Sequence, residues 1–316
     1  MPIKPIFNES AQLTLALLGP TAIGKTALAI ELARQFPNIR LISVDSAMVY
    51  RGLDIGSGKP DQATLSEVPH ALVDIRDPWE PYSAADFCRE ATQLIQATHA
   101  EGRIPFLVGG TFLYFKTLVS GLSNLPPAQP VIRQQIEECA TKLGWPAMHE
   151  LLAKVDAEAA ERIKPLDRQR ITRALEVFEV TGKPLSAWFA DSLASPEGQG
   201  VLSNLKSFSL VPANRTELHE RIATRFHHMM DQGFLAEVES LLANPKIMLD
   251  LPSMKSVGYR QLSEYVVFRD ESFSEKAIAA TRQLAKRQLT WLRSMPDIPT
   301  FTNTEACFKA ISNILA

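Results

Sequence analysis

Short apolar runs alternate with longer amphipathic stretches through the first third of the chain. The runs that we predict to be buried strands are Leu13–Leu18, Arg40–Val44, Ala71–Ile75 and Ile104–Val108. The stretches Ala27–Phe36 and Ser83–Ala100 have helical character, and Ser83 with Asp86 has the pattern of a helix-capping box. This alternation predicts an α/β fold, in which helices cover both faces of a parallel sheet.

The pattern changes after Gly121. A proline-rich linker at residues 125–130 is followed by helical periodicity from residue 131 to about residue 193, without a convincing strand. A second linker occupies residues 195–200. We therefore predict an all-helical insertion domain at residues 121–195.

The sheet pattern resumes after the second linker. Ser207–Val211 is predicted to return to the first sheet as a strand, and Arg215–Leu242 and Ser274–Met295 are predicted to be helical. We expect residues 1–120 and 196–316 to form one core that includes these C-terminal helices.

The loop after the first predicted strand carries the most specific motif in the chain. Residues 19–26, GPTAIGKT, fit the phosphate-binding pattern GxxxxGK[ST] between a strand and a helix. Such a loop aims backbone N–H groups, a helix N-terminus and the Lys25 ammonium at one anion. The motif predicts a P-loop NTPase-like sheet and a phosphate-bearing ligand, and it leaves open whether that ligand is a nucleotide.

Two more candidates stand where predicted strands end. Asp45 follows the run Leu41–Val44, and Thr111 follows Gly109-Gly110 after the next long strand. Ligands of open parallel sheets bind beyond the carboxyl ends of the strands, so both side chains are expected near the phosphate loop. Asp45 has the chemistry of a general base or a metal ligand, but also of a helix cap. Thr111 can equally belong to a tight turn.

The carboxylate that holds magnesium in kinases and ATPases is not obvious in this chain. In those enzymes an acidic residue usually follows a later strand. Here the run Phe106–Val108 ends in Gly-Gly, and Asp74 lies inside its apolar run. The residues alone thus give little support for a metal site.

Composition is that of an ordinary globular protein of one or two domains. The 316 residues are 46% apolar and 22% charged, and the net charge of −2 gives no general attraction for nucleic acid. Cys88, Cys139 and Cys307 are too few and too scattered for a disulfide framework or a CxxC zinc site. No run of about 18 apolar residues occurs, so we expect a cytoplasmic protein without a membrane span.

Basic residues nevertheless gather in two places. The first cluster, opposed only by Asp167, contains Arg162, Lys164, Arg168, Arg170 and Arg173. The second lies in residues 278–295, which contain four basic residues and no acid. A solvated charged face is the ordinary explanation, but acid-free clusters in a slightly acidic protein favour a polyanion.

The second cluster has a helical arrangement. At 100° per residue, Arg282, Lys286 and Arg293 fall on one face. Leu284, Trp291 and Met295 fall opposite and are predicted to face the core. Three arginines after the returning strand, Arg215, Arg221 and Arg225, are candidates for a further phosphate clamp.

Together these segments resemble the tRNA dimethylallyltransferase family, also called tRNA isopentenyltransferases, in its bacterial form. The matching stretches are GPTAIGKT (19–26), LISVDSAMVYRGLDIG (41–56), DIRDP (74–78), YSAADF (82–87), RIPFLVGGTFLYFK (103–116), RALEVFEVTGK (173–183), SVGYRQL (256–262) and ATRQLAKRQLTWLR (280–293). The resemblance covers essentially the whole chain. It implies transfer of a dimethylallyl group from dimethylallyl diphosphate to the N6 amine of adenosine 37 in tRNA anticodon loops.

The resemblance also assigns roles. Asp45 would be the general base, and Thr111 and Arg225 would orient and neutralise the leaving diphosphate. The residues that would bind the diphosphate are Gly19, Pro20, Thr21, Ala22, Ile23, Gly24, Lys25 and Thr26. Mg²⁺ would be bound with the diphosphate, and Thr26 would be its ligand from the protein. A diphosphate that is not a hydrolysed nucleotide explains the missing kinase carboxylate.

The residues that match tRNA-contacting positions of the family lie in several stretches. They are Asp45, Ser46, Ala47, Met48, Thr111, Arg133, Gln169, Arg170, Ile171, Thr172, Arg173, Ser256, Val257, Gly258, Tyr259, Arg260, Gln261, Lys286, Arg287, Gln288, Leu289, Thr290, Trp291, Leu292 and Arg293. The chain departs from the family at Ile23, where serine is more common, and at Ser57-Gly58, where threonine-alanine is more usual. We expect a monomer.

Three other functions are compatible with part of the pattern. A P-loop small-molecule kinase would need ATP turnover and a magnesium carboxylate. An adenylate isopentenyltransferase would modify free nucleotides and would not need the basic clusters. A non-catalytic RNA-binding module would leave Lys25 and Asp45 unexplained.

Overall fold

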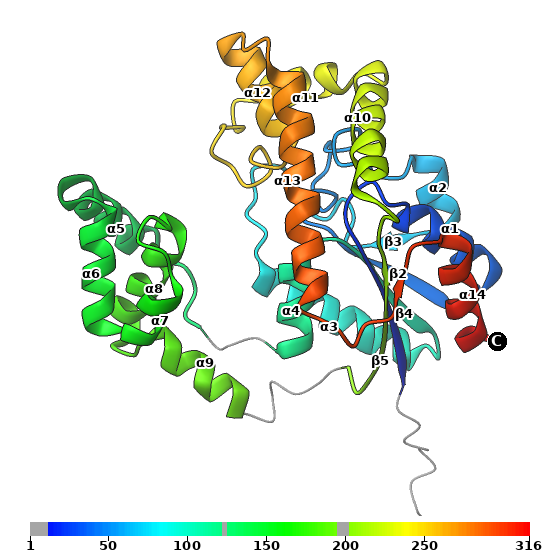
Figure 1. The fold of residues 1–316 in the computed structure, drawn as a ribbon, viewed down its shortest axis with the longest axis horizontal. Helices are drawn as coiled ribbons and strands as arrows, with labels where there is room; N and C mark the ends of the chain where they lie inside the picture. The colour runs from blue at the N-terminus through cyan, green and yellow to red at the C-terminus, as the bar shows by residue number, and fades with distance from the viewer. Residues whose placement is uncertain (1–11, 122–124, 195–201) are drawn as a thin grey trace, which may run out of the picture. The chain divides into compact units, whose positions relative to one another are not determined.

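The computed structural model describes residues 12–121, 125–194 and 202–316. The predicted linker at 195–200 lies outside these residues. The chain divides into two compact units, Met1–Thr117 with Val201–Ala316, and Leu118–Gly200. Figure 1 shows the elements of both units.

The first unit is built on a six-stranded parallel sheet. Its strands, in the spatial order β3-β2-β4-β1-β5-β6, are β3 (His70–Ala71), β2 (Ile39–Val44), β4 (Ile104–Gly109), β1 (Leu13–Leu18), β5 (Asn204–Leu210) and β6 (Thr300–Phe301). The predicted α/β class with a P-loop-type parallel sheet is confirmed. Four predicted strands lie within about three residues of their expected ends.

The predicted strand Ala71–Ile75 is wrong for most of its length. β3 ends at Ala71 because Leu72 and Asp74 adopt left-handed backbone conformations, with φ of 64° and 55°. Left-handed residues cannot continue a strand. Apolar composition alone did not reveal this turn.

Helices cover both faces of the sheet. Those that contact the strands most are α1 (Lys25–Gln35), α3 (Ala84–Ala100) and α14 (Thr304–Leu315). The other helices of this unit are α2 (Gln62–Glu67), α4 (Phe112–Ser120), α10 (Arg215–Asp231), α11 (Phe234–Leu242), α12 (Tyr259–Phe268) and α13 (Phe273–Arg293), of which α10 to α13 pack on one another. Because β1 to β2 and β3 to β4 run in opposite directions across the sheet, right-handed crossovers place α1 and α3 on opposite faces. α14 packs beside α1 (Figure 1).

At two places, local sequence determines where a helix begins or ends. Ser83 and Asp86 form the predicted capping box at the start of α3, each side chain accepting a hydrogen bond from the other's backbone N–H. The predicted helical stretch Arg215–Leu242 is interrupted at Gly233, whose φ of 96° ends one helix and allows α11 to begin.

The core of the first unit lies on the central strands. Leu15, Leu17 and Phe106 are fully buried, as expected for parallel strands covered on both sides. This rigid sheet ends at the phosphate loop, at Asp45 and at Thr111, so it fixes the site that follows.

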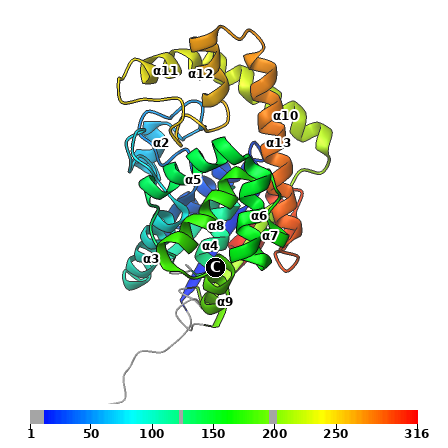
Figure 2. The same ribbon diagram turned by 90° about the vertical axis from the view of Figure 1, so that its left-hand side faces the viewer.

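The second unit is helical throughout its described residues. Its helices are α5 (Pro130–Leu143), α6 (Trp145–Val155), α7 (Ala157–Arg162), α8 (Arg168–Thr181) and α9 (Leu185–Ala194), with α5 to α8 visible together in Figure 2. Leu152, Ile171 and Val177 are the centre of its own apolar core.

Candidate active site

The phosphate loop joins β1 to α1 and has the geometry of an anion cradle. Ala22 and Gly24 have positive φ, 62° and 101°, which turn the backbone so that α1 starts at Lys25. Among the described residues, the N–H groups of Ile23 and Gly24 donate to no acceptor. Free N–H groups at a helix N-terminus attract an anion.

Lys25 has an unusual environment for a cation. Its ammonium donates to the carbonyl of Pro20 at 2.7 Å. Burial lowers the pKa of Lys25 to about 7, an effect that the charge of Asp45 opposes and that of Arg225 increases. An anion in the loop would restore the proton, because an opposite charge favours the ammonium form.

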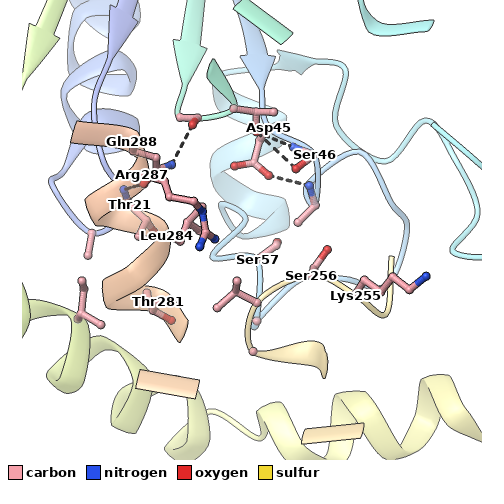
Figure 3. Close-up of a pocket in the computed structure, with 18 of the residues that line it drawn as sticks. Thr21, Asp45, Ser46, Ser57, Lys255, Ser256, Thr281, Leu284, Arg287 and Gln288 are labelled. Atoms are coloured by element: carbon pink, nitrogen blue, oxygen red, sulfur yellow. Dashed lines mark hydrogen bonds between the residues drawn. The ribbon is translucent and has the colours of Figure 1, made fainter. Parts of the chain in front are cut away.

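Asp45 follows β2 and uses its two carboxylate oxygens differently. Oδ1 accepts hydrogen bonds from the N–H groups of Ala47, at 2.8 Å, and Met48, at 3.1 Å. Oδ2 accepts none among the described residues, and the carboxylate lines the pocket shown in Figure 3. The sequence left a backbone cap and a general base or metal ligand as alternative roles for Asp45. One side chain can fill both kinds of role, because each uses a different oxygen.

Thr111 lies beside Asp45, as the strand ends predict. Its N–H donates to Val44 O at 3.1 Å, and its Oγ1 accepts from the N–H of Ser46 at 3.2 Å. These bonds join the ends of β2 and β4, which are neighbours in the sheet. A hydroxyl and a carboxylate thus meet at one rim of the pocket.

The three candidate clamp arginines on α10 differ in position. Arg225 lines the pocket, and its Nη2 donates to Ser57 O at 3.4 Å. It forms no ion pair among the described residues, and burial lowers its pKa while the charge of Asp45 opposes this shift. Arg221 reaches the phosphate loop through Ile23 O at 3.4 Å. Arg215, at the start of the helix, is exposed, about 15 Å of helix away from Arg225.

The pocket has a volume of about 530 Å³ and a wall that sequence reasoning did not identify. Its apolar side chains include Ile222, Phe226, Met229, Phe234, Val257 and Leu284. Ile222 and Met229 could have been found from Arg225, because positions three before and four after lie on the same helix face.

The loop that carries Ser57 is held by Glu237, which sequence reasoning missed, and by Tyr259, which it assigned only to a tRNA contact. The carboxylate of Glu237 on α11 accepts hydrogen bonds from three successive N–H groups, those of residues 54, 55 and 56, at 2.7–3.2 Å. The hydroxyl of Tyr259 donates to the same carboxylate at 2.6 Å. This clamp places Ser57 next to Arg225.

The basic face of α13 is largely as predicted, but its opposite face is not. Lys286 and Arg293 are exposed and form no ion pair among the described residues. The expectation that Leu284 and Trp291 face the core is wrong, since both line the pocket. The buried positions are Ala277, Ala285, Gln288 and Leu292, which lie about 20–100° further round the helix than the centre of the expected face. Met295 is half-buried, and Arg282 is half-buried with an Nε that lacks a partner.

The basic cluster of the second unit is less free than its sequence indicates. We expected Asp167 to be its only opposing acid, but Glu158 pairs with Arg162 and Glu176 pairs with Arg173. Glu176 is fully buried and also accepts from Arg133. Burial alone would raise the pKa of Glu176, yet the bonds from these two arginines lower it. Lys164 and Arg168 form no ion pair within residues 125–194.

Several members of the predicted tRNA-contacting stretches are buried within their own units. They are Ile171, Thr172, Tyr259, Gln288 and Leu292. Their side chains hold the fold, so side-chain contacts would fall to exposed neighbours such as Gln169, Arg260 and Lys286. The resemblance matches whole stretches to tRNA contacts. The burial of each side chain in the structure distinguishes the residues that can contact tRNA from those that stabilise the fold.

Asp74, the remaining candidate for a magnesium carboxylate, is engaged by a buried cation. Its carboxylate pairs at 2.5 Å with the buried ammonium of Lys59. In the described ranges, no group of three or more histidine, cysteine or acidic side chains could hold a metal ion. In the same ranges, no helix has the length and apolar character that a membrane span requires.

Comparison with known proteins agrees with the geometry. The sequence model of the IPP transferase family matches residues 48–295. The chain is 50% identical over 302 residues to tRNA dimethylallyltransferase 2 of Hahella chejuensis, covering 92% of this chain and 91% of the relative. It is also 50% identical over 293 residues to the tRNA dimethylallyltransferase of Paracidovorax citrulli, covering 89% and 84%.

Solved structures give the same result. The full-length tRNA isopentenylpyrophosphate transferase of Bacillus halodurans has a TM-score of 0.67 and 34% identity, covering 96% of this chain and 95% of that one. A eukaryotic dimethylallyltransferase acting on tRNA has a TM-score of 0.73 and 26% identity, covering 89% and 70%. The resemblance found in the sequence is confirmed, and the chain belongs to the tRNA dimethylallyltransferase, or IPP transferase, family.

Proposed function

We propose that this protein transfers the dimethylallyl group of dimethylallyl diphosphate to the N6 amine of adenosine 37 in tRNA, giving N6-isopentenyladenosine and diphosphate. The observation that carries the proposal is that Asp45 and Arg225 line one pocket together with the phosphate-loop residues 21 and 22. Both charges also act on the neighbouring ammonium of Lys25. The relatives' names support the same reaction.

The proposed chemistry uses Asp45 as the general base. A bond forms between N6 of adenine and C1 of the dimethylallyl group, while the bond between C1 and the diphosphate oxygen breaks. The proton leaves N6 for Oδ2 of Asp45, because the neutral amine is a weak nucleophile until it loses that proton. The free oxygen of Asp45 can accept it while Oδ1 keeps its backbone bonds.

The leaving diphosphate gains charge as the carbon–oxygen bond breaks. The free N–H groups of the phosphate loop, the Lys25 ammonium and the Arg225 guanidinium would bind it, and Thr111 would orient it. Preorganised donors aimed at developing charge are typically the largest contribution to such catalysis. The Thr21 N–H is engaged within the protein, so the backbone donors begin at Ala22.

Magnesium fits this donor set. Mg²⁺ is usually held by one or two protein oxygens together with substrate phosphates, so a site without a carboxylate cluster is suitable. The Thr26 hydroxyl, which has no partner among the described residues, would be the protein ligand. Bound there with the diphosphate, the ion would neutralise phosphate charge.

The remaining walls suit the other substrate groups. The apolar side chains on α10, α11 and α13 would receive the dimethylallyl group beside Arg225. Adenosine 37 lies in a single-stranded loop and would be drawn out of its stack into the pocket. The exposed cations Lys286 and Arg293 would contact the tRNA backbone, and the helical unit, residues 121–195, would supply a second contact. We propose that the protein acts as a cytoplasmic monomer.

Replacement of Lys25 by alanine tests the proposal. Dimethylallyl transfer should be abolished while tRNA affinity stays within about twofold, because Lys25 lies in the anion cradle and the tRNA is held by separate surfaces. Both quantities are measured on one preparation, with the exposed Lys309→Ala as the matched control. Equal loss of tRNA binding would overturn the separation of the two sites.

A further inference from the structure

Gln288 is a buried amide in the helix that carries the exposed cations. It is only 7% exposed and lies on the side of α13 that faces the strand ends. Its Oε1 accepts a hydrogen bond from the Thr21 N–H at 2.9 Å. Its Nε2 donates to Gly110 O at 2.9 Å. Figure 3 shows Gln288 next to Thr21.

The backbone is shaped to admit this amide. A Cβ atom at Gly110 would lie 2.5 Å from Gln288 Nε2 and 3.0 Å from Gly19 O. Glycine at this position therefore lets the side chain enter between two loops that are close together. Thr111, which borders Asp45, is the next residue in the chain.

The two bonds require an amide in one orientation. A carboxamide offers an acceptor and donors at opposite sides of one planar group. With the amide turned over, oxygen would face Gly110 O and nitrogen would face the Thr21 N–H. An apolar side chain of the same size would leave both backbone groups without this partner at a partly buried place, which is costly.

We propose that Gln288 is a positioning residue, which fixes the phosphate loop relative to the Gly110-Thr111 turn. The bond at Thr21 holds the loop one residue before Ala22, whose positive φ needs support from its surroundings. The bond at Gly110 holds Thr111, so the diphosphate cradle and the hydroxyl beside Asp45 stay aligned. This role deepens the proposed function and rests on it.

The role differs from a direct contact with tRNA. Both ends of the amide are engaged inside the protein, whereas Lys286, two residues earlier, is exposed. Loss of Gln288 should therefore impair use of dimethylallyl diphosphate and leave tRNA affinity unchanged.

Gln288→Met tests this with Gln283→Met as the matched control on an exposed position of the same helix. For Gln288→Met we expect a KM for dimethylallyl diphosphate raised about tenfold and a single-turnover rate lowered about tenfold, from the loss of two partly buried hydrogen bonds. The dissociation constant for tRNA should stay within about twofold. Unchanged KM and rate, or a loss confined to tRNA affinity, would overturn the proposal.

A second measurement needs neither a variant nor activity. In the wild-type protein without substrate, the Thr21 amide proton should exchange slowly with solvent, because it is bonded to a buried oxygen. The Ile23 amide proton, which has no acceptor, should exchange fast. Equal, fast exchange at both residues would overturn the proposal, and this result would leave the proposed reaction itself intact.

Discussion

Oδ1 of Asp45 accepts a hydrogen bond from the N–H of Ala47 at 2.8 Å, so one oxygen of this carboxylate holds the turn after β2. The other oxygen has no partner among the described residues, and the carboxylate lines the pocket (Figure 3). Structural and chemical roles can therefore be separated by changing one atom of the side chain.

Asp45→Asn keeps the acceptor for Ala47 and Met48 and removes the proton acceptor. We expect the single-turnover rate of transfer to fall by about 10²- to 10⁴-fold. The free energy of unfolding should change by less than about 1 kcal/mol, since the capping bonds remain. The single-turnover rate is measured by rapid quench and compared with that of the control variant Asp250→Asn. A loss of only a few fold would show that Asp45 caps the turn and is not the base.

Dimethylallyl diphosphate should bind more weakly as pH rises above neutrality. The pKa of Lys25, lowered by burial to about 7 in the free protein, means that the ammonium is present below this pH and lost above it. Binding above pH 7 must therefore take up a proton. We expect calorimetry at pH 8 in buffers of different ionisation enthalpy to show this uptake in the wild type and to lack it in Lys25→Ala. Equal proton uptake by both proteins would contradict the assignment.

The unpaired cations of α13 should contribute to tRNA binding through phosphate contacts. Lys286→Gln with Arg293→Gln should weaken tRNA binding and lower its salt slope by about 1.4, at roughly 0.7 per contact for single strands. Lys276→Gln with Arg34→Gln is the matched control, because those two exposed cations are paired with Asp270 and Glu67. If both double variants respond to salt like the wild type, the face is merely solvated.

Gly58 and Arg225 compete for the same volume. A Cβ at Gly58 would lie 1.8 Å from Arg225 Nη2, so Gly58→Ala should displace the guanidinium and raise the KM for dimethylallyl diphosphate several fold. The positive φ of 68° adds a stability cost of about 1–2 kcal/mol. Gly102→Ala is the control, since its φ of 70° carries the same strain with nothing near its Cβ. Identical KM values for both variants would rule out the displacement.

Local patterns in the sequence were sufficient to predict the structure where it is determined by a residue's own chemistry and by its neighbours in the chain. The phosphate loop, the capping box at Ser83 and the strand ends at Asp45 and Thr111 follow from a few adjacent residues. Among the three candidate arginines after the returning strand, the resemblance singled out Arg225. The short β3 was missed because the left-handed conformation of Leu72 is set by its surroundings and not by its residue type.

Contacts between distant parts of the chain could not be predicted. Glu176 pairs with Arg173 of the basic cluster from a buried position, and Glu237 reaches residues 54–56 across about 180 positions. Leu284 was assigned to the core because periodicity gives the face of a helix but not what lies opposite it. Gln288 has no local signal at all, since both its partners belong to other loops.

Transfer of label from dimethylallyl diphosphate tests the central claim most directly. The wild-type protein with Mg²⁺ is incubated with unmodified tRNA, with the same tRNA carrying guanosine at position 37, or with AMP, and label in each acceptor is measured. We predict label only in the tRNA with adenosine 37, sensitive to Lys25→Ala and Asp45→Asn. Label in AMP at a comparable rate, or transfer that persists in the guanosine 37 tRNA, would contradict the account.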